Sequence, residues 1–145
     1  MGNLLEILQG GVATDDRGAL SYLNVVPLAN FVRMYLVENF TTDTVRAFHG
    51  HKIEEKAALV VAGSAIIVVA KMELDILGSP ERYVLSARNP RLLRIPAGYA
   101  NGFRALEPGT KILFFSSTTI EQAKTDDYRY PYDQLGKEIW GVENR

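Results

Sequence analysis

Short apolar runs rich in β-branched and aromatic residues recur along the chain, and turn residues separate them. Seven such runs predict strands, at residues 19–26, 31–38, 57–62, 65–70, 82–86, 92–95 and 111–116. The connections hold typical turn sequences such as Asp15-Asp16-Arg17-Gly18 and Glu107-Pro108-Gly109. Helical spacing is rare and a short helix is expected only near residues 132–137, so the pattern predicts an all-β sandwich or barrel.

The run at residues 65–70 is apolar on both faces, which is unusual for an antiparallel strand with one solvated side. A second sheet or a subunit therefore has to cover it, and a homodimer is a reasonable expectation. The tail from residue 122 to 145 changes character, with tyrosines and a tryptophan among charges. We expect this tail to cap the barrel or to form a dimer contact.

Length and composition predict one globular domain spanning residues 1–145, with 47% hydrophobic and 23% charged residues. A net charge of −1 gives no general attraction for nucleic acid or for anionic lipid, so neither is expected as a partner. The most apolar stretch, residues 57–70, is shorter than the ~20 residues that span a bilayer. An anionic ligand would have to be held by a local cluster of side chains.

The chain contains no cysteine, which excludes disulfides and thiolate chemistry and is compatible with a reducing cytoplasm. Its first residues lack the basic start and long apolar core of a secretory signal. We therefore expect a cytoplasmic protein, in which any metal would have to bind histidine and carboxylate.

The two histidines of the protein, His49 and His51, lie two positions apart in the sequence. In a strand, where side chains alternate, both imidazoles lie on one face and Phe48 lies on the other. An exposed pair on a polar edge is the alternative. The arrangement favours a paired functional site.

Two segments resemble the motifs of the cupin superfamily. His49-x-His51-x-x-x-Glu55, followed by Gly63, is similar to the first motif, and Pro96-Ala97-Gly98-Tyr99-Ala100-Asn101 is similar to the second. The resemblance implies a double-stranded β-helix, a jelly-roll barrel. Asn101 stands where metal-binding members carry a third histidine, so we expect no metal and no other cofactor. A metal-dependent cupin is kept as a competing class.

Within the cupins, the chain resembles the isomerases of nucleotide-linked sugars. Arg46-Ala47-Phe48-His49-Gly50-His51-Lys52 is similar to the dTDP-4-keto-6-deoxyglucose 3,4-ketoisomerases. Lys56 and the segment from Ile95 to Phe103 are similar to the dTDP-4-dehydrorhamnose 3,5-epimerases. The resemblance implies a cofactor-independent epimerase or isomerase of a nucleotide-linked, dTDP-type 4-keto-6-deoxy sugar, in the synthesis of surface polysaccharide.

Both groups of enzymes remove a proton from carbon next to a ketone, and donors or cations then stabilise the enolate. By resemblance to the epimerases His49 is the base, and by resemblance to the ketoisomerases His51 shares or takes this role. Lys56 is the expected enolate stabiliser. The expected substrate contacts are Arg33, Tyr35, Arg46 and Asn101. Simple alternation along a strand turns Arg46 away from His49, so its inward position requires a bulge.

Two departures limit the resemblance. The epimerases use a tyrosine as proton donor, where this chain has Phe114, and they pair the histidine with an aspartate from a C-terminal extension that we expect to be absent here. A full 3,5-epimerase is therefore not expected. A single epimerisation is expected, with a 3,4-ketoisomerase and a non-catalytic sugar-binding cupin as alternatives. Candidates for the missing phenol are Tyr35, Tyr128, Tyr130 and Tyr132.

Overall fold

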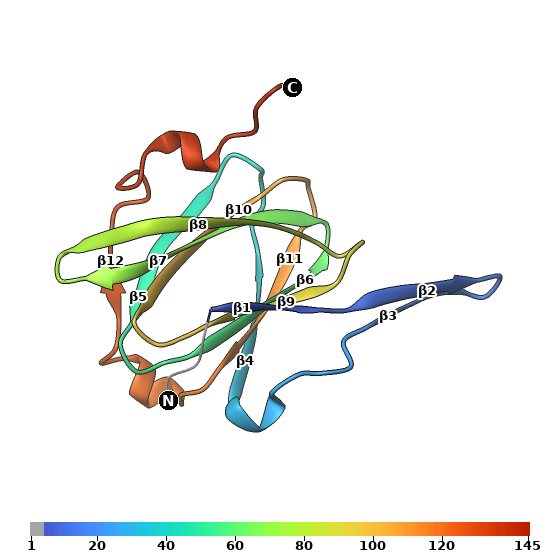
Figure 1. The fold of residues 1–145 in the computed structure, drawn as a ribbon, viewed down its shortest axis with the longest axis horizontal. Helices are drawn as coiled ribbons and strands as arrows, with labels where there is room; N and C mark the ends of the chain where they lie inside the picture. The colour runs from blue at the N-terminus through green and yellow to red at the C-terminus, as the bar shows by residue number, and fades with distance from the viewer. Residues whose placement is uncertain (1–4) are drawn as a thin grey trace.

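Two five-stranded antiparallel sheets make up the body of the protein in a computed structural model that describes residues 5–145 (Figure 1). The first, called the β4 sheet here, has the strand order β1 (Glu6–Gln9), β9 (Arg91–Ile95), β6 (Lys56–Ala62), β11 (Lys111–Ser116) and β4 (Arg33–Glu38). The second, called the β5 sheet, has the order β12 (Tyr128–Arg129), β5 (Val45–His51), β10 (Tyr99–Ala105), β7 (Ser64–Glu73) and β8 (Ile76–Ser86).

The core lies between these two sheets, where their inward apolar side chains pack together. The β4 sheet contributes side chains such as Val60, Leu93, Ile95, Ile112 and Phe114, and the β5 sheet contributes Ala65, Ile67, Val69, Leu85 and Phe103. Burying one such aliphatic or aromatic side chain stabilises the fold by about 1.5–3 kcal/mol. The predicted all-β jelly roll is confirmed, and each of the seven predicted runs contains a strand.

Helix is scarce among the described residues, as the sequence predicts. It is limited to η1 (Leu28–Asn30), α1 (Ile120–Ala123) and η2 (Lys137–Trp140). The helix expected at residues 132–137 is wrong, because this segment forms a turn and the 3₁₀-helix η2 begins only at Lys137. Gly136 separates the two with φ of 89°, a backbone conformation outside the helical region.

The outer face of β7 is covered by the tail of the same chain. Ile66, Val68 and Ala70 point away from the core and pack in a second apolar cluster with Phe48 and Trp140. Further tail residues pack against this cluster, namely Tyr130, Leu135 and Ile139. The tail therefore caps the barrel, and the apolar pattern of this strand needs no second subunit.

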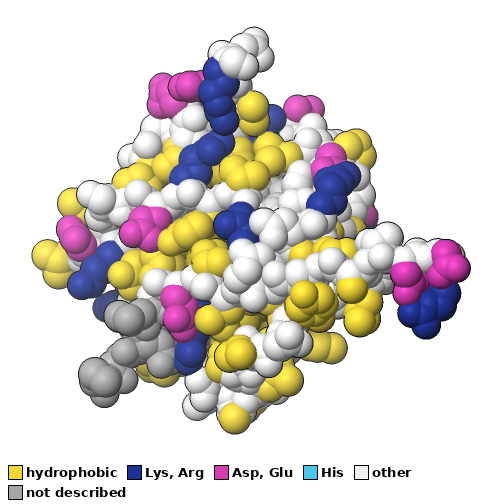
Figure 2. Space-filling model, turned by 45° about the vertical axis from the view of Figure 1, so that its right-hand side comes forward, with side chains coloured by type: hydrophobic (Ala, Val, Ile, Leu, Met, Phe, Trp, Pro, Cys, Tyr) yellow, Lys and Arg dark blue, Asp and Glu magenta, His cyan; other side chains and the backbone are white. Residues whose placement is uncertain are grey.

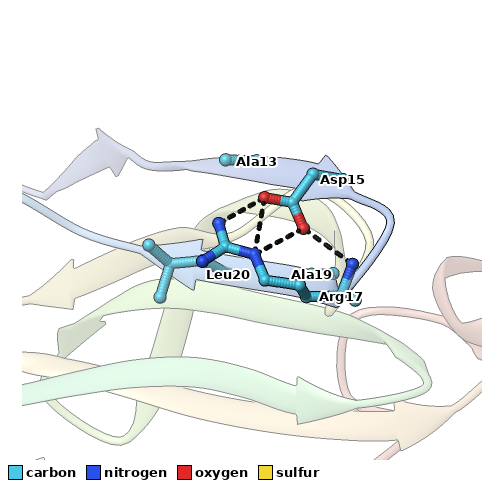
Figure 3. A pocket seen from close by; sticks show the side chains of 6 residues that line it. Ala13, Asp15, Arg17, Ala19 and Leu20 are labelled. Atoms are coloured by element: carbon cyan, nitrogen blue, oxygen red, sulfur yellow. Dashed lines mark hydrogen bonds and ion pairs between the residues drawn. The ribbon is translucent and has the colours of Figure 1, made fainter.

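A hairpin of β2 (Gly11–Asp15) and β3 (Gly18–Tyr22) projects from the body and forms a two-stranded sheet of its own (Figure 1). Its loop is the predicted turn, with Gly18 at φ of 136°. At the tip, the Asp15 carboxylate accepts hydrogen bonds from the backbone N–H of Arg17, at 2.9 Å, and from its guanidinium (Figure 3). The open pocket drawn there lies at the hairpin and contains none of the predicted site residues.

Candidate active site

Six of the seven predicted site residues line one cavity of about 170 Å³ between the two sheets. The β4 sheet contributes Tyr35, Val37, Lys56 and Phe114, and the β5 sheet contributes Arg46, His49, His51, Asn101 and Phe103. The lining thus combines polar and basic groups with apolar side chains. We call this space the histidine cavity.

A bulge in β5 brings Arg46 into the histidine cavity. His49 pairs with Asn101 and Arg46 pairs with Phe103, so β5 advances three residues where β10 advances two. The extra residue reverses the alternation and places Arg46 on the same face as His49. Gly102 permits the close approach of the strands, since a Cβ at this position would lie 2.2 Å from that of Ala47.

His49 is the more accessible of the two histidines, with 40% of its side chain exposed. Its Nδ1 lies 4.0 Å from Oδ1 of Asp127, a residue of the C-terminal tail. Partial burial lowers the pKa of His49, the charges of Arg129 and Lys56 lower it further, and Asp127 opposes them. The imidazole is therefore neutral at physiological pH, as a general base has to be.

His51 has both ring nitrogens turned to protein groups. Its Nδ1 lies 2.6 Å from the backbone oxygen of Asp126, and because a carbonyl can only accept, this nitrogen carries the hydrogen. Its Nε2 is buried, without a hydrogen bond to any described residue, and lies 3.1 Å from Oε2 of Glu54. Burial and the charge of Lys56 lower the pKa of this imidazole. Neither nitrogen is open to a ligand in this arrangement.

Glu54, which the sequence analysis did not identify, is the buried centre of the charged groups beside the cavity. Its carboxylate accepts hydrogen bonds from Arg33 at 2.7 Å, from Thr118 at 3.1 Å and from Ser116, and Lys56 Nζ lies 3.6 Å away. Burial raises the pKa of Glu54, but the hydrogen bonds from Ser116 and Thr118 and the charge of Lys56 together lower it below its usual value. The carboxylate is ionised and balances the buried cations.

Arg33 is the one predicted residue outside the histidine cavity. It lines a neighbouring cavity of about 290 Å³, which shares Tyr35, His51 and Lys56 with the first. Its guanidinium is held by Glu54 and by the backbone oxygen of Thr118, at 3.2 Å. Arg33 therefore lies at the edge of the site, where its guanidinium N–H groups already donate hydrogen bonds to protein atoms.

Lys56 and Asn101 both line the cavity, but only Lys56 has a polar partner for its side chain, the carboxylate of Glu54, whereas the side-chain oxygen of Asn101 has none among the described residues. Burial lowers the pKa of Lys56, and the adjacent Glu54 opposes this effect. The side-chain oxygen of Asn101 is buried and has no hydrogen-bond partner among residues 5–145. A buried polar atom without a partner is costly, so Asn101 leaves one unmet hydrogen bond in the lining of the cavity.

Glu55, the carboxylate of the first cupin motif, does not join the histidines. Its side chain pairs with Arg94 and lines neither cavity. No group of three histidine, cysteine or carboxylate side chains in the described part of the chain is arranged to hold a metal ion. The set of two histidines and Glu55 considered for a metal-dependent cupin is therefore not assembled.

Two aspartates of the tail also escaped the sequence analysis. The Asp126 carboxylate accepts hydrogen bonds from the backbone N–H groups of Lys52, Ile53 and Glu54, at 2.7–3.0 Å, and fixes the turn after the histidines. Asp127 places another carboxylate near His49, from the tail and not from a C-terminal extension of the kind that the resemblance implies for the epimerases. In the sequence, the two aspartates are visible only as neighbours that precede the tyrosines of the tail. Their position beside the histidines depends on the pairing of the tail with β5.

Residues 8–139 match the sequence model of a family described as dTDP-4-dehydrorhamnose 3,5-epimerase. The chain belongs to this family. The match covers most of the sequence and confirms the predicted relationship to the dTDP-sugar isomerase family. No described helix of this family member is long and apolar enough to cross a membrane.

Similar proteins lie on both branches that the sequence resembles. The spore coat polysaccharide biosynthesis protein SpsL of Bacillus subtilis is 30% identical over 92 residues, which is 61% of each of the two chains. The dTDP-4-dehydrorhamnose 3,5-epimerase of Bacillus anthracis, solved with TDP and PPi bound, has a TM-score of 0.75 at 23% identity and covers 95% of this chain and 85% of its own. A 3,4-ketoisomerase from Helicobacter canadensis has a TM-score of 0.68 at 24% identity, and the match covers 92% of this chain and 96% of the ketoisomerase. The solved structures confirm the jelly-roll fold.

Proposed function

We propose that the protein is a cofactor-independent epimerase or isomerase of a dTDP-linked 4-keto-6-deoxy sugar, with His49 as the general base. One observation supports this assignment above the others. His49 is a neutral imidazole in a sheltered cavity, opposite the buried cation Lys56. Family membership supplies the substrate class, and the name of the SpsL relative supports a place in surface-polysaccharide synthesis.

In the proposed reaction His49 removes a proton from the carbon beside the ketone, and the electron pair becomes an enolate. The Lys56 ammonium lies in a water-poor wall of the same cavity, where a positive charge stabilises a developing oxyanion strongly. Asn101 and Arg46 are the proposed hydrogen-bonding partners of the sugar. The reaction needs no redox step.

The position of His51 bears on the ketoisomerase alternative. Its Nδ1 is held by Asp126 and its Nε2 is buried against Glu54, so it supports a positioning role and leaves the base to His49. A 3,4-ketoisomerase with His51 as base would first have to break these contacts. A non-catalytic sugar-binding protein would bind the ligand but exchange no carbon-bound hydrogen.

We also propose that the protein is a homodimer, although the reason differs from the one the sequence suggested. The hairpin β2–β3 stands alone, and a single two-stranded sheet is marginally stable in water. Exposed apolar side chains lie on the outer face of β4, at Met34 and Leu36, and on the hairpin, at Leu20. Figure 2 shows hydrophobic side chains gathered around the base of the charged hairpin tip. A second copy related by a two-fold axis covers both surfaces at once.

A cytoplasmic location, compatible with the absence of cysteine, is part of the same proposal. The test of the function is incubation with dTDP-4-keto-6-deoxyglucose in deuterated water, followed by NMR, for the wild type, His49→Asn and His51→Asn. We expect deuterium to enter next to the ketone in the wild type and not in His49→Asn. Deuterium at C3 without a change of carbonyl position argues against the ketoisomerase. Undiminished exchange in His49→Asn would remove the proposed base.

A further inference from the structure

Tyr35 and His49 line the histidine cavity from opposite sheets. The tyrosine lies on β4, in one sheet, and the histidine lies on β5, in the other, and both side chains line the same space. A sugar ring held between the two sheets would have the imidazole on one face and the phenol on the other. Inversion at a carbon needs this arrangement, with a base on one face and an acid on the other.

The Tyr35 hydroxyl is free to give up its hydrogen. It makes no hydrogen bond to any of the described residues, although the cavity around it is rich in polar groups. The other tyrosines considered as donors do not line the cavity. The Lys52 ammonium lies over the ring of Tyr128, and the Tyr130 hydroxyl donates a hydrogen bond to the backbone oxygen of Leu74. Tyr132 is 42% exposed.

The electrostatic setting keeps this phenol protonated until it acts. Burial, together with the charge of Glu54, raises the pKa of Tyr35 to about 12, so the hydroxyl holds its proton at neutral pH. The cations Arg33 and Lys56 lie 5.4 Å and 5.9 Å from the centre of its ring. They are placed to stabilise the phenolate that forms when the proton leaves.

Tyr35 also has a specific relation to Phe114. The two residues pair directly across β4 and β11, and their rings stack with centroids 5.3 Å apart and planes 14° from parallel. Phe114 lines the cavity but has no hydroxyl to donate. A phenol is therefore present on this wall, one strand away from the phenylalanine.

We propose that Tyr35 is the proton donor of the reaction, and that it acts on the ring face opposite His49 so that one stereocentre is inverted. The inference rests on the proposed function. His49 takes the proton as the C–H bond breaks, and the electron pair becomes the enolate. The Tyr35 O–H bond then breaks, its proton forms a new C–H bond on the other face, and the ketone is restored. The phenolate then takes a proton from water, and the imidazolium of His49 releases its proton to water.

The test follows dTDP-4-keto-6-deoxyglucose in deuterated water by NMR, with wild type, Tyr35→Phe, the double variant Tyr35→Phe with Phe114→Tyr, and the control Tyr132→Phe. We expect Tyr35→Phe to lose inversion by about 100-fold or more, the usual contribution of a general acid. Deuterium should still enter next to the ketone with retained configuration, because His49 still forms the enolate. The added phenol at position 114 should restore part of the inversion.

The outcomes separate this inference from the proposed function. Inversion by Tyr35→Phe at the wild-type rate overturns Tyr35 as the donor and leaves the base untouched. Absence of exchange in the wild type overturns the proposed function, and the donor with it. Binding of dTDP by each variant, measured by calorimetry, checks that the cavity is intact. If Tyr35→Phe does not fold, Tyr35→Leu takes its place: loss of inversion with retained deuterium exchange supports Tyr35 as the donor, and inversion at the wild-type rate opposes it.

Discussion

Nδ1 of His49 lies 4.0 Å from Oδ1 of Asp127, although one residue is on β5 and the other immediately precedes β12. The short strand β12 pairs with the end of β5, Tyr128 with Gly50 and Arg129 with His49, and so sets the distance. An aspartate near the histidine raises the pKa of the imidazole and favours its protonated form. The tail therefore supplies a carboxylate partner for the proposed base.

Asp127→Asn should slow the exchange reaction moderately. Both side chains are about 40% exposed, and exposed ion pairs are worth about 1 kcal/mol or less, which corresponds to roughly fivefold in rate. Steady-state kinetics measure the effect on kcat/KM. The matched control is Asp133→Asn, an exposed tail residue away from the cavity, which should leave the rate unchanged. A rate in Asp127→Asn equal to the wild type would show that the carboxylate does not assist His49.

The pH dependence of kcat/KM should show an acid limb with its midpoint below the ordinary histidine value of ~6.5. Burial and nearby cations lower the pKa of His49, so the neutral, basic form persists to lower pH than in an isolated histidine. Activity should rise with pH through this limb and then reach a plateau. Asp127→Asn should move the midpoint lower still. A midpoint at or above ~6.5 in the wild type contradicts the assignment.

Glu54→Ala should destabilise the fold by about 3 kcal/mol, the usual cost of removing one partner from a buried ion pair. Glu54 is 2% exposed and neutralises Arg33 and Lys56, which would be left without a carboxylate. Urea denaturation measures the change. Glu121→Ala, which removes an exposed pair with Lys124, should change stability by no more than about 0.5 kcal/mol. Equal stability of the two variants would refute the role of Glu54.

Leu36→Glu should convert the proposed dimer to a monomer. The substitution places a charge on the outer face of β4, where burial against a second copy would leave it unpaired. Light scattering coupled to size-exclusion chromatography gives the mass, with Leu74→Glu, an exposed residue in the β7–β8 turn of the other sheet, as control. A wild-type mass of about one chain would end the dimer proposal.

The sequence by itself determined the fold class and most of the polar residues that line the histidine cavity. Alternation of apolar and polar residues is a local property of a strand, so it revealed the seven runs and the shared face of the two histidines. The opposite direction of Phe48 follows from the same period, and its burial in the outer cluster confirms it. The family resemblance rested on local spacing as well, which is why it survived comparison.

Only the tertiary structure decided how distant groups meet. The bulge that turns Arg46 inward depends on the register between β5 and β10, and the carboxylate beside His49 depends on the path of the tail. The same holds for the buried neighbours of His51 and for the position of Tyr35 on the sheet opposite the base. These relations arise from contacts between segments far apart in sequence, and local periodicity holds no information about which segments those are.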